Sequence, residues 1–259
     1  MMNAEKERKF NLAFNIFLVA GMLVALTLTT IFKLQQPGAR TFMLVLAAFG
    51  AMMGILNTVL SANGHILTFV FGLVDVVIAS IVLLDNGIMG NFALHAFYFL
   101  PMQFVGFWQW RKRGAALEGG AGGESGLRAR RLSRRQWAWL VAGLLAGIAA
   151  LYLILLFVDK AQLAQGRIDS VSKPKVLLDA TVMALNIAGQ VLLSFAFMEQ
   201  WYIWILVNIS SISLWAVTLM GPGASGNAAV MLVKYIFYLL NSLNGLRIWL
   251  NLSRRERIG

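Results

Sequence analysis

The chain has 259 residues, of which 59% are hydrophobic and 13% charged, whereas soluble domains are about 45–50% apolar and about 25% charged, so the composition excludes an ordinary soluble protein. It contains no cysteine, which excludes disulfides and thiolate chemistry. The net charge is +11, but eight of the 22 Lys and Arg residues lie between Arg111 and Arg135 and most others flank apolar runs, a distribution that favours anionic lipid headgroups over nucleic acid as the partner.

Eight apolar runs are long enough to cross a bilayer as helices, which takes about 18 or more residues with few charges. They cover residues 11–32, 41–62, 65–84, 88–110, 137–158, 176–197, 201–220 and 228–250. The first run lacks an A-x-A cleavage site and is too long for a signal peptide, so we expect a retained helix. The sequence therefore predicts an all-α membrane protein with eight transmembrane helices.

The second to fourth runs are less polar than the last three but also contain polar residues, and those of the third run form one helical stripe. The polar residues are Asn57 and Ser61 on the second run, His65, Thr68 and Asp75 on the third, and His95, Gln103 and Trp110 on the fourth. Pro101 removes a backbone donor from the fourth run, so we expect an irregular helix there. Asp75, like Asp179 in the sixth run, is hard to explain as packing; we expect either carboxylate to pair with Lys234 or to stay protonated.

The loop between the fourth and fifth runs reads RKRGAALEGGAGGESGLRARRLSRR, residues 111–135. Its glycines resemble a phosphate-binding loop only superficially, because no Lys-Ser or Lys-Thr follows and the flanks are rich in arginine. We therefore expect a flexible linker. If the N-terminus is cytoplasmic, the cytoplasmic segments contain 14 Lys and Arg residues and the opposite side six, which predicts that both termini are cytoplasmic.

The two sides of this linker contain a faint internal repeat. A shift of 139 residues places the fourth run on the eighth, so that Gly106 matches Gly245 and Trp110 matches Trp249. We expect two parallel three-helix repeats, a known transporter plan. The predicted domains are an N-terminal segment with an extra helix (1–40), a first repeat (41–113), a linker with a connecting helix (114–175), a second repeat (176–250) and a cytoplasmic tail (251–259), that is, a 3+1+3 arrangement plus one helix.

Each of the last three runs has a polar stripe on one helical face. The stripes are Asp179, Met183, Asn186 and Gln190; Trp201, Trp204, Asn208, Ser211 and Trp215; and Lys234, Tyr238, Asn241 and Asn244. Polar side chains are costly in hydrocarbon, so we expect the stripes to surround one polar site. The alternatives are that single amides act as interhelical glue and that Trp201 belongs to the interfacial aromatic belt.

Such a site suits a small, flat, polar ring. Aromatic side chains stack on its faces, amides offer donors and acceptors, and tryptophan attracts a cationic ring. No arginine pair within the runs offers a phosphate clamp, which favours an uncharged or singly cationic nucleoside-like ligand. The two histidines are not at metal-ligand spacing and no H-E-x-x-H occurs, so we expect neither an enzyme nor a metal or cofactor site.

Three stretches resemble the PnuC family of bacterial vitamin transporters: FWQWRKR at 107–113, WYIWILVN at 201–208 and YLLNSLNGLRIW at 238–249. The resemblance covers about residues 41–250, and W-x-x-W-x-x-x-N is its most specific element. It implies a fold like that of a full-length SWEET sugar transporter, in the bacterial inner membrane and often as a homotrimer. It also implies facilitated diffusion of nicotinamide riboside, which a cytoplasmic kinase then traps by phosphorylation.

Stripes and resemblance together define a candidate substrate site. It comprises Asn57, Gln103, Asn186, Gln190, Trp201, Trp204, Asn208, Tyr238, Asn241 and Asn244. By the resemblance, Trp201, Trp204 and Asn208 would contact the pyridinium or its riboside, and Gln103, Asn241 and Asn244 would add hydrogen bonds.

The chain also departs from the family pattern. The family often has Gln-Tyr where this chain has Lys234-Tyr235, and Tyr-Gly-Trp-Trp where this chain has VGFWQW at 105–110. These differences leave thiamine, riboflavin or a deoxynucleoside open as the substrate. A symporter that binds a proton or Na⁺ at Asp75 or Asp179 also stays open.

Overall fold

The structure of the chain, a computed structural model, describes residues 4–38, 40–85, 89–115, 126–166, 170–220 and 226–255. Its elements are α1 (Ala4–Leu34), α2 (Thr41–Ala62), α3 (Thr68–Asp85), α4 (Met89–Leu94), the π-helical turn η1 (His95–Phe99), α5 (Leu100–Lys112), α6 (Arg134–Ala164), α7 (Lys173–Ser194), α8 (Gln200–Met220) and α9 (Gly226–Arg255). Because α4, η1 and α5 are continuous, the described residues form eight helical segments, one for each predicted run.

Five of these segments, within the described part of the chain, are long and apolar enough to cross a membrane: α1, α2, α3, α6 and α7. The prediction of an all-helical membrane protein is therefore confirmed. Two of the other segments, α8 and the continuous α4–η1–α5, contain tryptophans and buried amides, including Gln103 and Asn208. Burial of these polar groups inside the bundle is the arrangement that lipid requires.

The helix that contains Pro101 is irregular at the expected place. The π-helical turn η1 lies directly before Leu100 and Pro101. Proline has no backbone N–H to donate, and a π-helical turn changes the hydrogen-bond pattern of the helix locally, so that proline can be accommodated. Within η1 the Tyr98 hydroxyl donates to the Ile187 carbonyl of α7 at 2.7 Å. The irregular turn therefore connects two helices that are far apart in the sequence.

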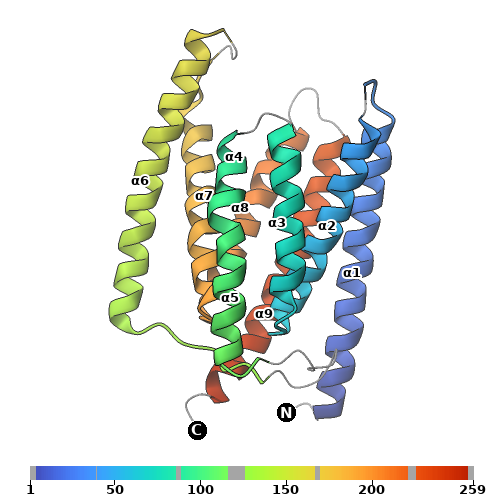
Figure 1. Cartoon of the computed structure of the whole chain (residues 1–259), viewed down its shortest axis with the longest axis vertical. Helices are drawn as coiled ribbons and strands as arrows, with labels where there is room; N and C mark the ends of the chain where they lie inside the picture. The colour runs from blue at the N-terminus through green and yellow to red at the C-terminus, as the bar shows by residue number, and fades with distance from the viewer. Residues whose placement is uncertain are drawn as a thin grey trace.

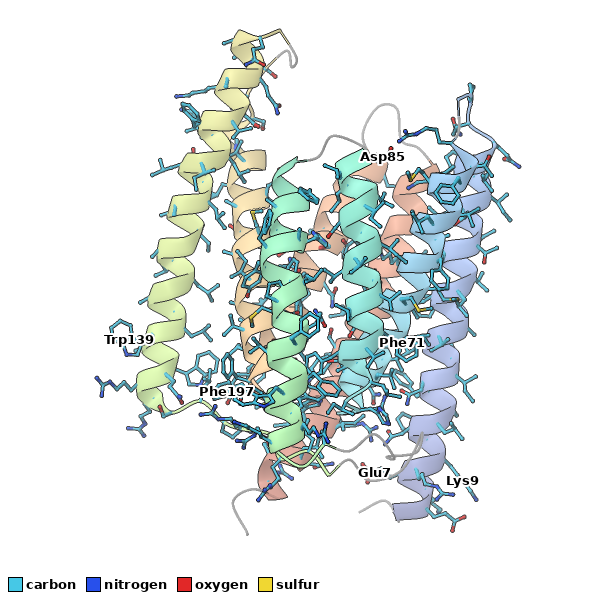
Figure 2. All side chains as sticks on the ribbon, in the orientation of Figure 1. Glu7, Lys9, Phe71, Asp85, Trp139 and Phe197 are labelled. Atoms are coloured by element: carbon cyan, nitrogen blue, oxygen red, sulfur yellow. The ribbon has the colours of Figure 1, made fainter. Side chains whose placement is uncertain are left out.

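Six helical segments form a closed ring (Figure 1). In order, α2 packs on α3, α3 on α4–η1–α5, α5 on α7, α7 on α8, α8 on α9, and α9 again on α2. Outside the ring, α1 packs on α2 and α9, and α6 packs on α7. Much of α6 faces away from the bundle. Trp139, for example, points outward in Figure 2, and 69% of the surface of this residue is exposed.

Helix α1 begins and α9 ends at the same end of the bundle, the lower end in Figure 1. We call this the basal end. Here Trp110 of α5 is fully buried and meets Phe69 of α3 edge to face, with ring centroids 4.9 Å apart. Its Nε1–H donates to the Leu193 carbonyl of α7 at 2.7 Å. The first half of the chain, α2 to α5, is thus bound to the second half, α7 to α9, through helices α5 and α7.

Trp249 of α9 makes the matching contacts in the other half. It is fully buried, meets Trp201 of α8 at a centroid distance of 6.0 Å, and donates its Nε1–H to the Ser61 carbonyl of α2 at 3.1 Å. The two indoles, Trp110 and Trp249, lie 5.3 Å apart. The pair that the sequence matches by a shift of 139 residues therefore meets at the basal end.

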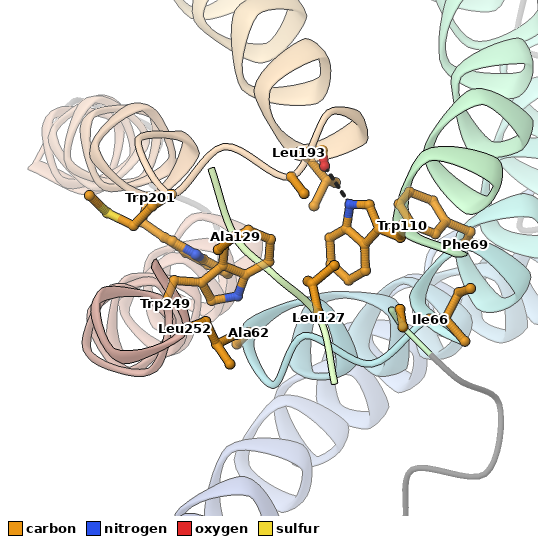
Figure 3. Close-up of a cluster of buried hydrophobic side chains, with 13 residues drawn as sticks. Ala62, Ile66, Phe69, Trp110, Leu127, Ala129, Leu193, Trp201, Trp249 and Leu252 are labelled. Carbon is orange, nitrogen blue, oxygen red and sulfur yellow. Dashed lines mark hydrogen bonds between the residues drawn. The ribbon is translucent and has the colours of Figure 1, made fainter. Parts of the chain in front are cut away.

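Residues 126–132, which we call the strap, pass across this basal end (Figure 3). Leu127 and Ala129 are buried in the same cluster as Trp110 and Trp249. The prediction of a flexible linker is therefore wrong for residues 126–132, because the side chains of Leu127 and Ala129 fill the space beside the indoles. The glycine-rich residues 116–125 lie outside the described residues.

We expect Gly106→Ala to destabilise the bundle. A Cβ at this position would overlap the buried ring of Phe69, which also packs on Trp110 and has little room to move. Overpacking of this kind costs about 1–3 kcal/mol, so thermal unfolding of the purified protein should occur at lower temperature. Gly143→Ala on α6 is the control, because a Cβ there meets nothing within 4 Å; equal melting temperatures for the two variants would contradict the packing argument.

Candidate functional site

Two predicted amides on α8 and α9 lie between neighbouring helices of the ring. Asn208 is buried, and its Nδ2–H donates to the Ser242 hydroxyl of α9 at 2.9 Å. Asn241 is fully buried, and its Nδ2–H donates to the Thr58 carbonyl of α2 at 3.0 Å. Both side chains therefore connect neighbouring helices of the ring and neither lies in lipid.

The two predicted amides of the first half meet at a glycine of α3. A Cβ on Gly72 would lie 2.5 Å from Oε1 of Gln103 and 3.1 Å from Nδ2 of Asn57. The missing side chain thus leaves room for both amides. Gln103 is buried, and the Thr68 hydroxyl donates to the Asn57 carbonyl at 2.9 Å.

The polar residues of α7 link this helix to α5. Gln190 is buried and its Nε2–H donates to the Ser194 hydroxyl at 3.4 Å; that hydroxyl donates to the Met102 carbonyl at 3.3 Å. Asn186, one turn away, donates to the Val182 carbonyl of its own helix at 2.8 Å. Gln190 therefore contributes to a contact between the two halves, whereas the amide hydrogen of Asn186 bonds within one helix.

The two tryptophans of the W-x-x-W-x-x-x-N stretch have different surroundings. Trp204 is half-buried and packs against α7, where a Cβ on Gly189 would lie 2.9 Å from its ring. Trp201 is buried in the basal cluster, against Gly245 and Trp249. Trp204 and Trp201 thus lie at successive levels of α8, with Trp201 closer to the basal end.

Several buried polar atoms of α8 and α9 have no hydrogen-bond partner in the structure. They are Nε1 of Trp201, Oδ1 of Asn241, Nδ2 of Asn244 and both side-chain polar atoms of Gln200. Buried polar groups are normally paired, so these donors and acceptors are suited to a polar ligand. Gln200 is not among the site residues predicted from the sequence; the signal available for it was its place directly before Trp201 in EQWYIWILVN.

Tyr238 lies apart from this group. With Lys234 it lines a cavity of about 150 Å³ between α1, α2 and α9, outside the ring. Lys234 interacts electrostatically with Asp75 of α3, whose carboxylate packs against Gly54 of α2. Of the two carboxylates that the sequence offers as partners of Lys234, Asp75 is the one whose charge acts on it.

The described residues contain no group of three or more His, Asp or Glu side chains placed to hold a metal ion. What the ring interior offers is amides, hydroxyls and indole rings. These groups bind by hydrogen bonding and stacking.

Comparison with known proteins identifies the family. Residues 44–251 match the family described as "Nicotinamide mononucleotide transporter". The chain is 33% identical to the "Nicotinamide riboside transporter PnuC" of Neisseria mucosa over 211 residues, which is 82% of this chain and 74% of the relative. It is 32% identical to the protein of the same name from Haemophilus influenzae, over 81% of each chain.

A solved structure agrees with these matches. The fold is similar to that reported as "Crystal structure of the Vitamin B3 transporter PnuC", with a TM-score of 0.62, 31% identity and 92% of each chain covered. Sequence and fold agree over most of the chain. The chain belongs to the PnuC family of membrane transporters, which are not enzymes.

Proposed function

We propose that the chain transports nicotinamide riboside by facilitated diffusion, through alternating access to a site inside the six-helix ring. The observation that carries the proposal is the set of buried, unpaired polar atoms on Trp201, Asn241 and Asn244. Such atoms can bind the carboxamide and the sugar hydroxyls, while the half-buried ring of Trp204 can stack on the cationic pyridinium. The relatives named above are nicotinamide riboside transporters.

The candidate site suits the riboside better than its phosphate ester, the mononucleotide, although the description of the matching family names the mononucleotide. Recognition of a phosphate group usually relies on arginine, whose fork of donors matches the phosphate oxygens. Among the described residues, the polar side chains at the candidate site are amides, hydroxyls and indoles. Arg247 binds Asn244, Asn11 and Glu7 instead, so its charge is already partly neutralised.

We expect purified protein in liposomes to take up labelled nicotinamide riboside without any imposed ion gradient. A hundredfold excess of unlabelled riboside should abolish uptake of the label, while the same excess of nicotinamide mononucleotide should leave most of it. Inhibition by the mononucleotide as strong as by the riboside would reassign the substrate. Uptake that needs a proton or Na⁺ gradient would instead favour a symporter, with Asp75 as the first residue to test.

We further propose the 3+1+3 arrangement, with α2–α5 and α7–α9 as parallel repeats, α6 as the connecting helix and α1 as the extra helix. The crossed tryptophan contacts at Leu193 and Ser61 support it. So do the turns within each half, because Gly64 after α2 has φ of 66° and Ala196 after α7 has φ of 58°. Equivalent backbone geometry at equivalent turns is what a repeat predicts.

The remaining proposals concern the cell. We place the protein in the bacterial inner membrane with both termini and the basal end in the cytoplasm, because the segments at this end contain the larger number of Lys and Arg residues. We also propose trapping of the substrate by a cytoplasmic kinase, which would make net uptake possible without energy coupling, and assembly as a homotrimer.

A further inference from the structure

Backbone hydrogen bonds attach the strap to the turn between α7 and α8. The backbone N–H of Arg130 donates to the Ala196 carbonyl at 2.7 Å, and the N–H of Met198 donates to the Arg130 carbonyl at 2.9 Å. This pairing forms the isolated parallel bridge between Arg130 and Phe197. The guanidinium of Arg130 also lies over the Phe197 ring, 4.3 Å from its centroid.

A second fastening is an ion pair. Nε of Arg131 lies 3.3 Å from Oε1 of Glu199, whose side chain is 2% exposed, while that of Arg131 is 38% exposed. Nη1 of Arg131 also donates to the Ser253 hydroxyl of α9 at 3.4 Å. Loss of Arg131 would leave a buried carboxylate without its cation, which is unfavourable. The pair therefore favours the attached position of the strap.

The other end of the strap is held by the first half of the chain. The N–H of Arg128 donates to the Arg113 carbonyl at 3.0 Å, and Nε of Arg113 donates to the Arg128 carbonyl at 2.7 Å. Between these two fastenings, Leu127 and Ala129 lie against Trp110 and Trp249 (Figure 3). The strap thus joins the basal ends of both halves and fills the space between them.

We propose that the strap is the gate at the basal end of the transport path, and that Arg131 and Glu199 are its latch. The proposal rests on the transport function proposed above. In alternating access the two halves separate at one end while they close at the other, so opening the basal end separates Trp110 from Trp249. The strap is attached to both halves, and because Glu199 of the latch belongs to the second half, opening releases the strap from that half. The contacts on this side are the two backbone hydrogen bonds of Arg130, its stacking on Phe197, and the bonds of Arg131 to Glu199 and Ser253. All of them can break without unfolding any helix.

The absence of cysteine makes a locking experiment direct. The double variant Arg130→Cys, Phe197→Cys places a cysteine at each end of the isolated β-bridge. Paired strands lie about 4.7–4.9 Å apart, which is within the Cα–Cα range that a disulfide spans. With an oxidant, we expect exchange of labelled nicotinamide riboside in liposomes to fall at least about tenfold, as for a closed gate, and to recover with a reductant. Riboside binding, measured by calorimetry, should change less than about twofold, because the site stays open on the opposite side.

The controls are the two single-cysteine variants, which the oxidant should not affect. Full exchange by the oxidised protein, with no free thiols left, would overturn the gate. Absence of exchange in the wild type would refute the proposed transport function and not the gate alone.

A second test releases the strap. Ser61 of α2 is 5% exposed, and its carbonyl binds Trp249 behind the strap, so Ser61→Cys is a reporter of basal opening. Adding Arg131→Ala should raise its labelling by a maleimide applied from the basal side at least about fivefold, since it shifts the equilibrium towards the open state. Arg135→Ala, which removes a neighbouring charge on α6 but no latch, should leave labelling unchanged. Equal labelling in the Arg131 and Arg135 variants would overturn the latch.

Discussion

Nicotinamide riboside is expected to bind about 100-fold more weakly when Trp204 is replaced by alanine. Stacking on an aromatic ring contributes about 0.5–1.5 kcal/mol beyond area burial, and a desolvated cation–π contact about 2 kcal/mol. A loss of about 2.8 kcal/mol corresponds to the 100-fold change. Trp204 is half-buried, so its ring has an accessible surface that the ring of Trp201 lacks. It lies one helical turn from Asn208, whose amide is buried. Calorimetric titration of the purified variant measures the effect.

Because Trp204 packs on Gly189 and on two apolar clusters, its removal also lowers stability. Trp204→Phe keeps a ring and should retain most of the affinity. Trp139→Ala removes an exposed indole from α6 and should change neither affinity nor melting temperature. If Trp204→Ala stays folded and binds the riboside with unchanged affinity, Trp204 does not contact the substrate.

The helices and their buried faces could be predicted from the sequence because both follow local rules. A long apolar run has to be a helix in lipid, where every backbone donor and acceptor needs a partner within the segment. A polar side chain in such a run has to face protein, which is why Gln103, Asn208 and Asn241 are buried. Pro101 also acts locally, and η1 lies beside it as expected.

The strap could not be predicted in this way. Leu127 and Ala129 are two apolar residues among arginines, without the periodicity that marks a helix or a strand. Their burial results from packing against Trp110 and Trp249, which lie 17 residues before and 120 residues after Leu127–Ala129 in the chain. Only tertiary structure brings these residues together.

The position of Tyr238 shows a second limit of sequence reasoning. Lys234, Tyr238 and Asn241 share a helical stripe, but a stripe wide enough to touch two neighbouring helices faces two environments. Asn241 binds Thr58 of α2, whereas Tyr238 lines the cavity beside α1. The stripe predicts burial on one side of α9, and the packing of α1 decides which residues share a site.

Asn241→Ala is expected to weaken riboside binding by about 30-fold. The Asn241 side chain is fully buried, its nitrogen donates to Thr58 of α2 at 3.0 Å, and its oxygen has no partner. Replacement removes the oxygen as an acceptor for the ligand and also removes the hydrogen bond from α9 to the Thr58 carbonyl of α2. Leaving a buried hydrogen-bonding group without its partner costs about 1–3 kcal/mol, and about 2 kcal/mol corresponds to the expected change. Calorimetry on the folded variant gives the affinity.

Asn15→Ala is the control that distinguishes binding of the substrate from a contact that only holds two helices together. Asn15 of α1 donates to the Asn63 side chain at 3.1 Å and also has an unpaired buried oxygen, but it lies outside the ring. Its replacement should lower stability by about 0.6 kcal/mol, the average for a polar contact between membrane helices, and leave riboside affinity unchanged. If both variants lose stability alike and neither loses affinity, Asn241 only holds α9 to α2. A selective loss of affinity in Asn241→Ala would instead mean that its unpaired oxygen binds the substrate, since both residues have a buried acceptor without a partner and Asn15 lies outside the ring.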